Sequence, residues 1–276
     1  YIADITTPEN RARGMGMIGA AFGLGFVFGP ALAGVLCHLA LENSWRPQFV
    51  VGVAAAAFST LDLALAGARL PESLTEELRS RARAPGSRLQ RMAAALRTPG
   101  LGLPILLFFL STIAWSTLEP TLGLASKDRF EFTEAQTGYL FGYLGLIVAL
   151  VQGGLTGRLV RRSGEARMAL AGSLLLTVGL ALLPLARHWG PLLGLLALVA
   201  VGQALLMPGL QSLISRAAAQ DEQGATLGVS QGFSSLARVI GPATGGALYG
   251  IGQDYPFWFS AALLAGAFAL ATRLRQ

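Results

Sequence analysis

Long apolar stretches separated by short polar segments dominate the sequence. A helix that crosses a bilayer needs about 20 apolar residues, because each residue adds 1.5 Å and the hydrocarbon core is about 30 Å thick. Eight stretches reach this length, and we predict a transmembrane helix in each. Their approximate limits are residues 14–36, 47–68, 101–123, 136–157, 167–187, 191–213, 225–250 and 255–272. The pattern therefore predicts an all-α polytopic membrane protein.

The composition agrees with a membrane location and excludes several other classes. Only 13% of the 276 residues are charged and 53% are hydrophobic, whereas a soluble domain carries about 25% charged residues. The hydrophobic content is too high for a disordered chain. Cys37 is the only cysteine, so the sequence is no disulfide-stabilised scaffold. The lipid bilayer is the first partner that the sequence predicts.

The Lys and Arg residues are distributed unevenly between the two predicted sides of the membrane. A net charge of +6 could indicate nucleic-acid binding in a soluble protein, but the cations stand in short blocks between apolar stretches, and we expect no nucleic-acid partner. If the helices alternate in direction, sixteen of the twenty-one Lys and Arg residues fall on one side and four on the other. The cation-rich side is predicted to be cytoplasmic, with both chain ends. The polar segment 69–100, with seven arginines, is predicted to be a cytoplasmic linker.

Two Gly/Pro-rich stretches repeat in register at an offset of 212 positions. The first holds Gly16, Gly25, Gly29, Pro30 and Gly34, and the second holds Gly228, Ala237, Gly241, Pro242 and Gly246, with Gly245 beside them. Membrane carriers are often built from duplicated halves, yet the four helices between 101 and 213 have no earlier counterpart. We therefore expect a fragment of a twelve-helix protein. Its predicted parts are 1–68, the last two helices of the first half; 69–100, the linker; and 101–276, a complete second bundle of six helices.

Small residues line one face of the repeated helix. Glycines spaced nine and four positions apart fall on one side of a helix, where they allow a neighbouring helix to approach closely. Pro30 removes one backbone hydrogen bond and bends the helix. Such a face suits a tight seal between moving helices, and it equally suits ordinary helix packing in a membrane bundle.

The beginning of the chain resembles the region of helices four and five in carriers of the major facilitator superfamily. The matching residues are Tyr1-Ile2-Ala3-Asp4-Ile5-Thr6, Glu9, Arg11-Ala12-Arg13-Gly14 and the run from Gly16 to Gly34, which is similar to the antiporter motif of that family. Leu70-Pro71-Glu72-Ser73 is similar to the end of helix six in its tetracycline/proton antiporter group. The resemblance implies that the eight predicted helices correspond to helices five to twelve of a twelve-helix fold.

The resemblance also implies a function and an energy source. A member of this group would be a monomeric carrier in the bacterial cytoplasmic membrane. It would export a small amphiphilic compound or drug in exchange for protons, with no cofactor. In the family the Gly/Pro helix is held to limit leak and to favour exchange over symport. A nutrient symporter of the same superfamily and an inactive, truncated membrane fragment are the alternatives that the sequence leaves open.

A stretch from Gly157 to Arg167 resembles the cytoplasmic gate sequence of the family, Gly-x3-Asp-Arg-x-Gly-Arg-Arg. Arg161 stands where the family has Asp, and Glu165 stands where a basic residue is usual. The gate candidates that the resemblance implies are Asp4, Arg13, Gly157, Arg162, Gly164 and Arg167. A basic turn that only fixes the topology would have a similar composition.

Charged residues inside a predicted span are costly and so mark candidate functional sites. Glu119 is a candidate for the coupled proton, because a carboxyl group withdrawn from water binds protons more readily. Its alternative role is that of a helix-end residue before Pro120. Arg238 could hold an anionic substrate group or pair with Glu119, and Asp62 is a weaker candidate on a scaffold helix. Gln152 is a neutral hydrogen-bonding candidate for a cavity, or an ordinary contact between helices.

The sequence shows no motif that would indicate a metal site or an enzyme. His38 and His188 stand far apart at predicted helix ends, so no metal set is expected. The sequence holds no ATP-binding Gly-Lys-Ser/Thr. Its Gly-x-Ser-x-Gly stretch, at residues 228–232, lies inside a predicted transmembrane helix and so does not form the strand-to-helix elbow of a serine hydrolase. A membrane-embedded enzyme is therefore disfavoured, and secondary active efflux of a small molecule is the predicted function.

Overall fold

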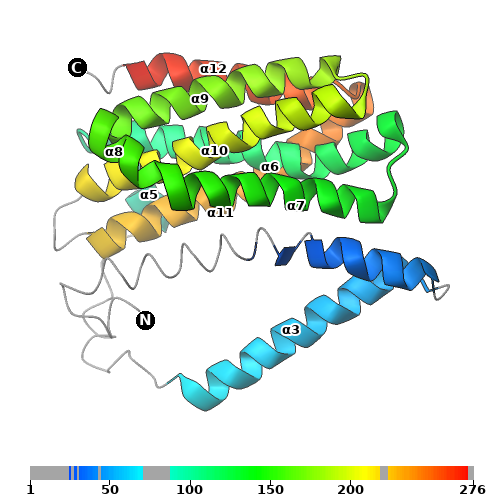
Figure 1. Cartoon of the computed structure of the whole chain (residues 1–276). Helices are drawn as coiled ribbons and strands as arrows, with labels where there is room; N and C mark the ends of the chain where they lie inside the picture. Colours follow the sequence, from blue (N-terminus) through cyan, green and yellow to red (C-terminus); the bar gives the residue numbers. More distant parts are fainter. Residues whose placement is uncertain are drawn as a thin grey trace. The chain divides into compact units, whose positions relative to one another are not determined.

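The computed structural model describes residues 25, 28–29, 31–42, 45–70, 88–217 and 223–272, and this part of the chain consists of helices joined by short turns, without a strand (Figure 1). The first helix of this part includes Ala31–Glu42. The others are α3 (Pro47–Arg69), α5 (Arg88–Arg97), α6 (Gly102–Phe130), α7 (Glu134–Val151), the π-turn η1 (Gln152–Thr156), α8 (Gly157–Ser163), α9 (Glu165–Leu182), the 3-10 turn η2 (Leu183–Leu185), α10 (Trp189–Ala217), α11 (Gln223–Ile251) and α12 (Tyr255–Ala271). The predicted all-α class is confirmed.

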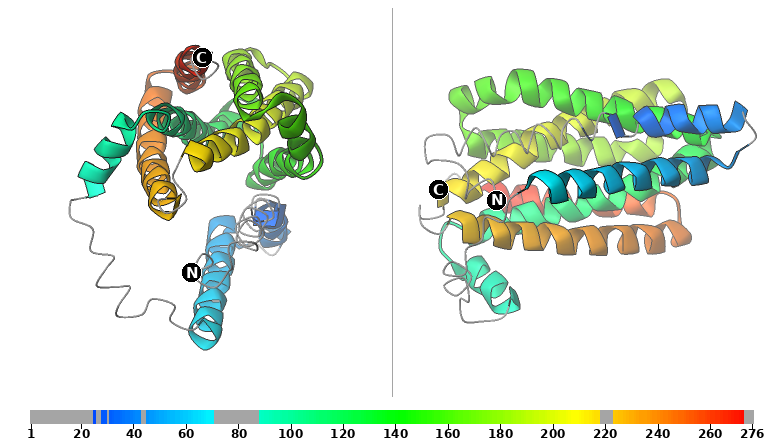
Figure 2. Two further views of the ribbon diagram at one scale, coloured as in Figure 1. Left: turned by 90° about the vertical axis from the view of Figure 1, so that its left-hand side faces the viewer. Right: turned by 90° about the horizontal axis from the view of Figure 1, so that it is seen from below.

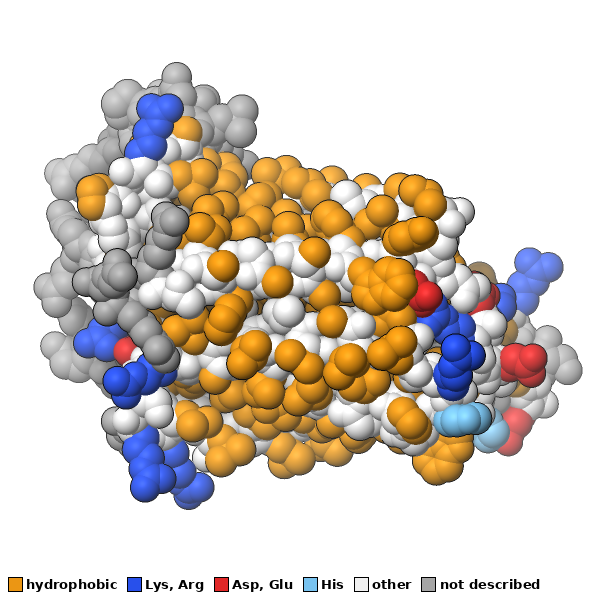
Figure 3. Space-filling model, turned by 90° about the horizontal axis from the view of Figure 1, so that it is seen from above, with side chains coloured by type: hydrophobic (Ala, Val, Ile, Leu, Met, Phe, Trp, Pro, Cys, Tyr) orange, Lys and Arg blue, Asp and Glu red, His pale blue; other side chains and the backbone are white. Residues whose placement is uncertain are grey.

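Five of the described helical segments are long and apolar enough to cross a bilayer. They are Pro47–Arg69, Gly102–Phe130, Glu134–Thr156, Glu165–Leu185 and Trp189–Ala217. Ala31–Glu42 and Tyr255–Leu270 are apolar but shorter. α11 has 29 residues, but its glycines, its serines and Arg238 lower its hydropathy, so it is not among the five. The structure thus supports a membrane fold without reproducing the predicted count of eight spans. Hydrophobic side chains cover much of the face shown in Figure 3.

Several helices end later than the apolar pattern predicted. The first predicted helix, 14–36, continues to Glu42, and the helix predicted for 101–123 continues to Phe130. The apolar stretches stop where polar side chains begin, but backbone hydrogen bonding does not depend on side-chain polarity. α6 ends where Glu131 adopts a left-handed conformation, with φ of 55°, and its backbone N–H closes the last turn onto the carbonyl of Lys127.

The segment 136–157 is not one regular helix, as predicted, but changes its winding near its end. α7 gives way at Gln152 to one π-helical turn, which contains the pair Gly153 and Gly154. The Thr156 hydroxyl donates a hydrogen bond of 3.2 Å to the carbonyl of Val151, five residues earlier, which is the spacing of this wider turn. The predicted linker 69–100 likewise contains a helix, α5, that the apolar pattern did not indicate.

The chain divides into two compact units. One comprises the described residues of Tyr1–Gly86 with Phe132–Tyr143, and the other comprises those of Ser87–Glu131 with Leu144–Gln276. In the second unit, α6 packs against α10, α11 and α12, while α9 packs against α10 and α12. The functional division into 1–68, 69–100 and 101–276 stays a prediction.

Glycines bring α9 and α10 into backbone contact. Gly172 and Gly179 on α9, and Gly202 and Gly209 on α10, form a seam with a spacing of seven residues. A Cβ atom added to Gly202 would lie 2.6 Å from the backbone nitrogen of Leu176, and one added to Gly172 would lie 2.7 Å from the carbonyl oxygen of Gly202. Only glycine fits at such distances, so the seam makes this helix pair close-packed.

Candidate functional site

The gate candidates of the second half gather where α8 turns into α9. Gly164 joins the two helices with φ of 79°, a conformation that favours glycine. Arg162 is exposed on α8, and Arg167 is exposed in the first turn of α9. Gly157 begins α8. The chain therefore turns sharply at Gly164, with an exposed arginine on the helix at each side of the turn.

Glu165, the first residue of α9, binds the end of α10. Its carboxylate accepts a hydrogen bond of 2.7 Å from the Arg216 guanidinium and one of 3.3 Å from the Ser212 hydroxyl. The Glu165 side chain is 15% exposed, whereas that of Arg216 is 71% exposed. The largely buried carboxylate thus fixes the start of α9 to α10, while the arginine reaches it from the surface.

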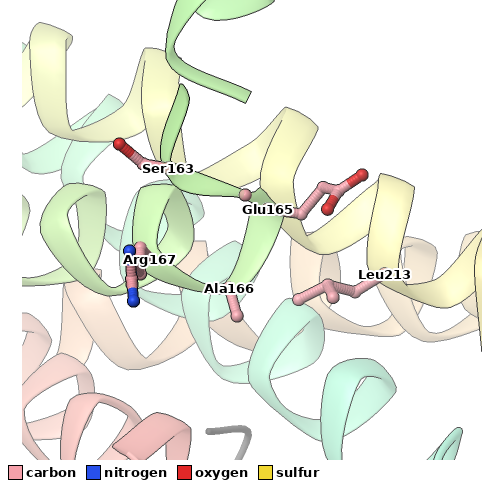
Figure 4. Close-up of a pocket in the computed structure, with 6 residues that line it drawn as sticks. Ser163, Glu165, Ala166, Arg167 and Leu213 are labelled. Atoms are coloured by element: carbon pink, nitrogen blue, oxygen red, sulfur yellow. The ribbon is translucent and has the colours of Figure 1, made fainter. Parts of the chain in front are cut away.

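An open hollow of about 560 Å³ lies beside this ion pair. It is lined by Ser163, Gly164, Glu165, Ala166, Arg167 and Leu213. Figure 4 shows the Glu165 and Arg167 side chains pointing in different directions from the start of α9, with Leu213 contributed by α10. The hollow therefore presents separate positive and negative groups at a glycine hinge, which suits a contact surface better than a closed binding cavity.

Arg216 and Ser212 were missed by the sequence reasoning, although a signal for Arg216 was present. The offset of 212 positions that relates the two Gly/Pro stretches places Arg216 at the position of Asp4. The two residues have opposite charges, and Glu165 likewise stands where a basic residue is usual. These two exchanges give the ends of α9 and α10 side chains of opposite charge, and the structure brings them together as the Glu165–Arg216 pair.

Exchanging the two charges of the Glu165–Arg216 pair is expected to restore the stability that each single substitution removes. Glu165→Arg would place a second cation beside Arg216, and Arg216→Glu would place a second carboxylate beside Glu165. We expect each single variant to lose about 1 kcal/mol of stability, the usual scale for a partly exposed ion pair, and the double variant to recover most of it. Thermal unfolding of the detergent-purified chain measures this. Additive losses in the double variant would mean that the pair contributes nothing.

Glu119 lies in the C-terminal half of α6, next to the ring of Trp115. The Trp115 indole N–H donates a hydrogen bond of 2.8 Å to its carboxylate, and the Glu119 side chain is half-buried. Arg238 is exposed on α11, and among the described residues no ion pair joins it to Glu119. α6 and α11 nevertheless pack together, so the two charges belong to one helix pair.

The second Gly/Pro stretch forms the contact between α11 and α6. A Cβ atom on Gly241 would lie 2.5 Å from the Cβ atom of Ser116, and one on Gly245 would lie 3.1 Å from the carbonyl oxygen of Thr117. The Thr117 hydroxyl donates a hydrogen bond of 3.2 Å to the carbonyl of Gly241. The expected close approach of a neighbouring helix is thus present at two of the predicted glycines, whereas Gly228 and Gly246 face open space.

The first Gly/Pro stretch is described only in part. Asp4, Arg13, Gly16 and Pro30 lie outside the described residues. Among the described residues, no atom lies within 4 Å of a Cβ atom built on Gly25 or on Gly29. On Gly34 such an atom would lie 3.0 Å from the ring of Tyr139 and 3.1 Å from the carbonyl oxygen of Ala135, both within the first unit.

The remaining candidates lie apart from these sites. Asp62 is exposed on α3, and Gln152 is half-buried in the π-turn. Besides the candidates named above, the side-chain carbonyl oxygen of Gln203, on α10, is buried and accepts no hydrogen bond from the described residues. Within the described ranges, no group of three or more His, Cys, Asp and Glu side chains could hold a metal ion.

A polar network joins the helices of the second unit at the end opposite to the Glu165–Arg216 pair. Arg129, at the end of α6, forms an ion pair with Asp254 and donates hydrogen bonds to the carbonyl of Pro184 at 3.3 Å and to the Gln253 side chain at 3.2 Å. The neighbouring residue Asp128 accepts a hydrogen bond of 2.8 Å from the Tyr249 hydroxyl. Two consecutive residues of α6 therefore contact α11, the turn before α12 and η2.

Comparison with known proteins supplies the family context for this geometry. A model of the Major Facilitator Superfamily matches residues 1–165 and 105–276 of this chain. The chain is 31% identical over 271 residues to the Bos taurus "Major facilitator superfamily domain-containing protein 10", covering 90% of this chain and 56% of that protein. It is 32% identical over 278 residues to "Tetracycline resistance protein, class C" of Escherichia coli, covering 97% of this chain and 65% of that protein.

A solved structure is similar as well. The crystal structure of the human organic anion transporter MFSD10 (TETRAN) superposes with a TM-score of 0.70 at 28% identity, covering 98% of this chain and 66% of that chain. This chain thus spans about half to two thirds of the length of the relatives that it matches.

Proposed function

This chain belongs to the Major Facilitator Superfamily, and on that premise we propose that it is part of a secondary active transporter that exports a small amphiphilic compound in exchange for protons. The observation that carries the proposal is Glu119, a half-buried carboxylate on a membrane-spanning helix, bonded to Trp115. A carboxyl group at such a place can take up and release a proton during a transport cycle. The similarity to a tetracycline resistance protein supports export.

Alternating access would need the second unit to move as one piece. The glycine seam between α9 and α10 and the Arg129 network at the end of α6 both support such stiffness. The Glu165–Arg216 pair would then hold α9 to α10 at the opposite end of the second unit, where the gate candidates lie. In this proposal the transporter acts as a monomer in a bacterial cytoplasmic membrane and uses the proton gradient without a cofactor.

A second candidate differs in the substrate. Arg238 is an exposed cation in the middle of α11, a helix otherwise rich in small residues. A cation in a membrane-spanning segment can bind an anionic group of a substrate. The similar human protein MFSD10 is an organic anion transporter. Export of organic anions is therefore the alternative that a specific residue favours.

Transport by the complete protein in everted membrane vesicles tests both candidates. With an imposed proton gradient, we expect uphill accumulation of a fluorescent amphiphilic cation, and dissipation of the gradient should release it. Uptake of a fluorescent organic anion instead, lost in Arg238→Gln, would select the second candidate. If the gradient drives neither compound in a panel of both kinds, the proposal of proton-coupled export fails.

Labelling of single cysteines is expected to place the two ends of α6 on opposite sides of the membrane. Thr98 precedes α6 and Lys127 lies in its last turn, and both are exposed. In a Cys37→Ser background, a membrane-impermeant maleimide added to intact cells should modify Lys127→Cys and should reach Thr98→Cys only after permeabilisation. The reverse pattern would invert the predicted topology.

A further inference from the structure

Positive charge is concentrated at one end of the second unit. α6, α9 and α11 begin at this end and α10 ends there, because α9 runs antiparallel to α10 and α6 runs parallel to α11. Eight arginines lie on the described helical turns of this end, against one carboxylate, Glu165. They are Arg88, Arg91, Arg97, Arg158, Arg161, Arg162, Arg167 and Arg216. The opposite end carries three cations and three carboxylates, which are Lys127, Arg129 and Arg187, and Asp128, Glu131 and Asp254.

Helix α5 lies across this cationic end and does not continue into α6. Gly100 has φ of 81°, and Gly102 packs directly against the carbonyl of Leu96, so that a larger residue could not make the turn. Both views in Figure 2 show the turquoise α5 turned away from the direction of α6. On its inner side Met92 packs over Gly232 of α11. α5 is therefore held at the start of a membrane-spanning helix, at the level of the lipid headgroups.

The outer side of α5 combines apolar surface with charge. An open hollow of about 530 Å³ is lined by Ala93, Ala94, Arg97, Thr98 and Pro99. The Thr98 hydroxyl donates its hydrogen bond to the carbonyl of Ala94, at 3.1 Å, so Arg97 supplies the charged donor of the hollow. Leu96 is 39% exposed beside it. Small apolar side chains next to a guanidinium group match a lipid, with its acyl chain on the apolar wall and its phosphate near the arginine.

We propose that α5 and this hollow bind an anionic phospholipid from the leaflet in which α6 begins. The charge of the site selects an anionic headgroup, since one arginine near an anionic membrane surface favours binding by about fivefold. The position of α5 beside α6 selects a membrane lipid over a soluble anion. The proposal rests on the membrane location of the family and is independent of which compound, if any, the protein transports.

Fluorescence quenching by brominated lipids tests the site in the intact chain. Ala93→Cys, in a Cys37→Ser background, is labelled with bimane, and the protein is reconstituted in phosphatidylcholine bilayers. Quenching by brominated phosphatidylglycerol is compared with quenching by brominated phosphatidylcholine at equal content. We expect at least about a fivefold preference for phosphatidylglycerol, which high salt should reduce.

Matched variants separate a specific site from general attraction. Arg97→Gln should abolish the preference, while Arg97→Lys should keep most of it. Lys127→Gln removes the same charge from an exposed position at the opposite end and should leave the preference unchanged. Equal quenching by both lipids, no quenching by either, or the same loss in the opposite-end control would each overturn the proposal. Displacement of the lipid by inorganic phosphate would show a soluble anion site instead.

Discussion

Gly202→Leu is expected to break the packing of α9 against α10 and to lower the melting temperature of the purified chain more than any other single change considered. A Cβ atom at this position already lies 2.6 Å from the backbone nitrogen of Leu176 and 2.9 Å from the carbonyl oxygen of Gly172. Backbone atoms cannot rotate aside as a side chain can, so the two helices must separate. Overpacking costs about 3 kcal/mol or more at such a place, which corresponds to at least about 6 °C.

A second glycine of α10 gives the matched control for this prediction. Gly194 lies on the same helix, and no atom of the described part of the chain lies within 4 Å of its built Cβ atom. Gly194→Leu therefore adds the same side chain to the same helix without a clash, and we expect its melting temperature to stay close to that of the parent chain. Gly202→Ala should lie between the two. Equal melting temperatures for Gly202→Leu and Gly194→Leu would show that the helices do not approach this closely.

The sequence predicted the positions of the long helices, because each of them contains a long apolar stretch. The interiors of α3, α6, α9 and α10 coincide with predicted stretches. Their ends were less predictable, since α6 continues for seven residues beyond its predicted end, through Lys127 and Asp128. α5 was missed because its alanines and arginines give no membrane-length signal.

Contacts between helices were predicted only where a repeat pointed to them. Gly241 and Gly245 lie in a repeated stretch, and they contact α6 as expected. Gly172 and Gly202 form a contact that is just as close, but they lie in no repeated stretch, and α10 also contains Gly190 and Gly194, which have no described atom within 4 Å of a built Cβ atom. The pairing of Glu165 with Arg216 depends on how two helices separated by 51 positions meet, which no local pattern contains.

Glu119→Gln is expected to abolish uphill, proton-driven export by the complete protein while leaving downhill movement of the substrate measurable. Glutamine keeps the size of the side chain, and its carbonyl can still accept the hydrogen bond that the Trp115 indole donates at 2.8 Å. It cannot exchange a proton. Loss of coupling with retained folding would therefore come from the missing titration and not from disturbed packing.

The control for this change lies at the end of the same helix. Glu131 is exposed where α6 stops, so Glu131→Gln removes the same charge from a carboxylate that water already surrounds. We expect export by this variant at parent rates. Export is measured in everted vesicles as substrate accumulation at several imposed proton gradients, and downhill movement is measured without a gradient. If Glu119→Gln accumulates substrate as well as Glu131→Gln does at every gradient, Glu119 only ends a buried face of α6 beside Pro120, and another acid carries the proton.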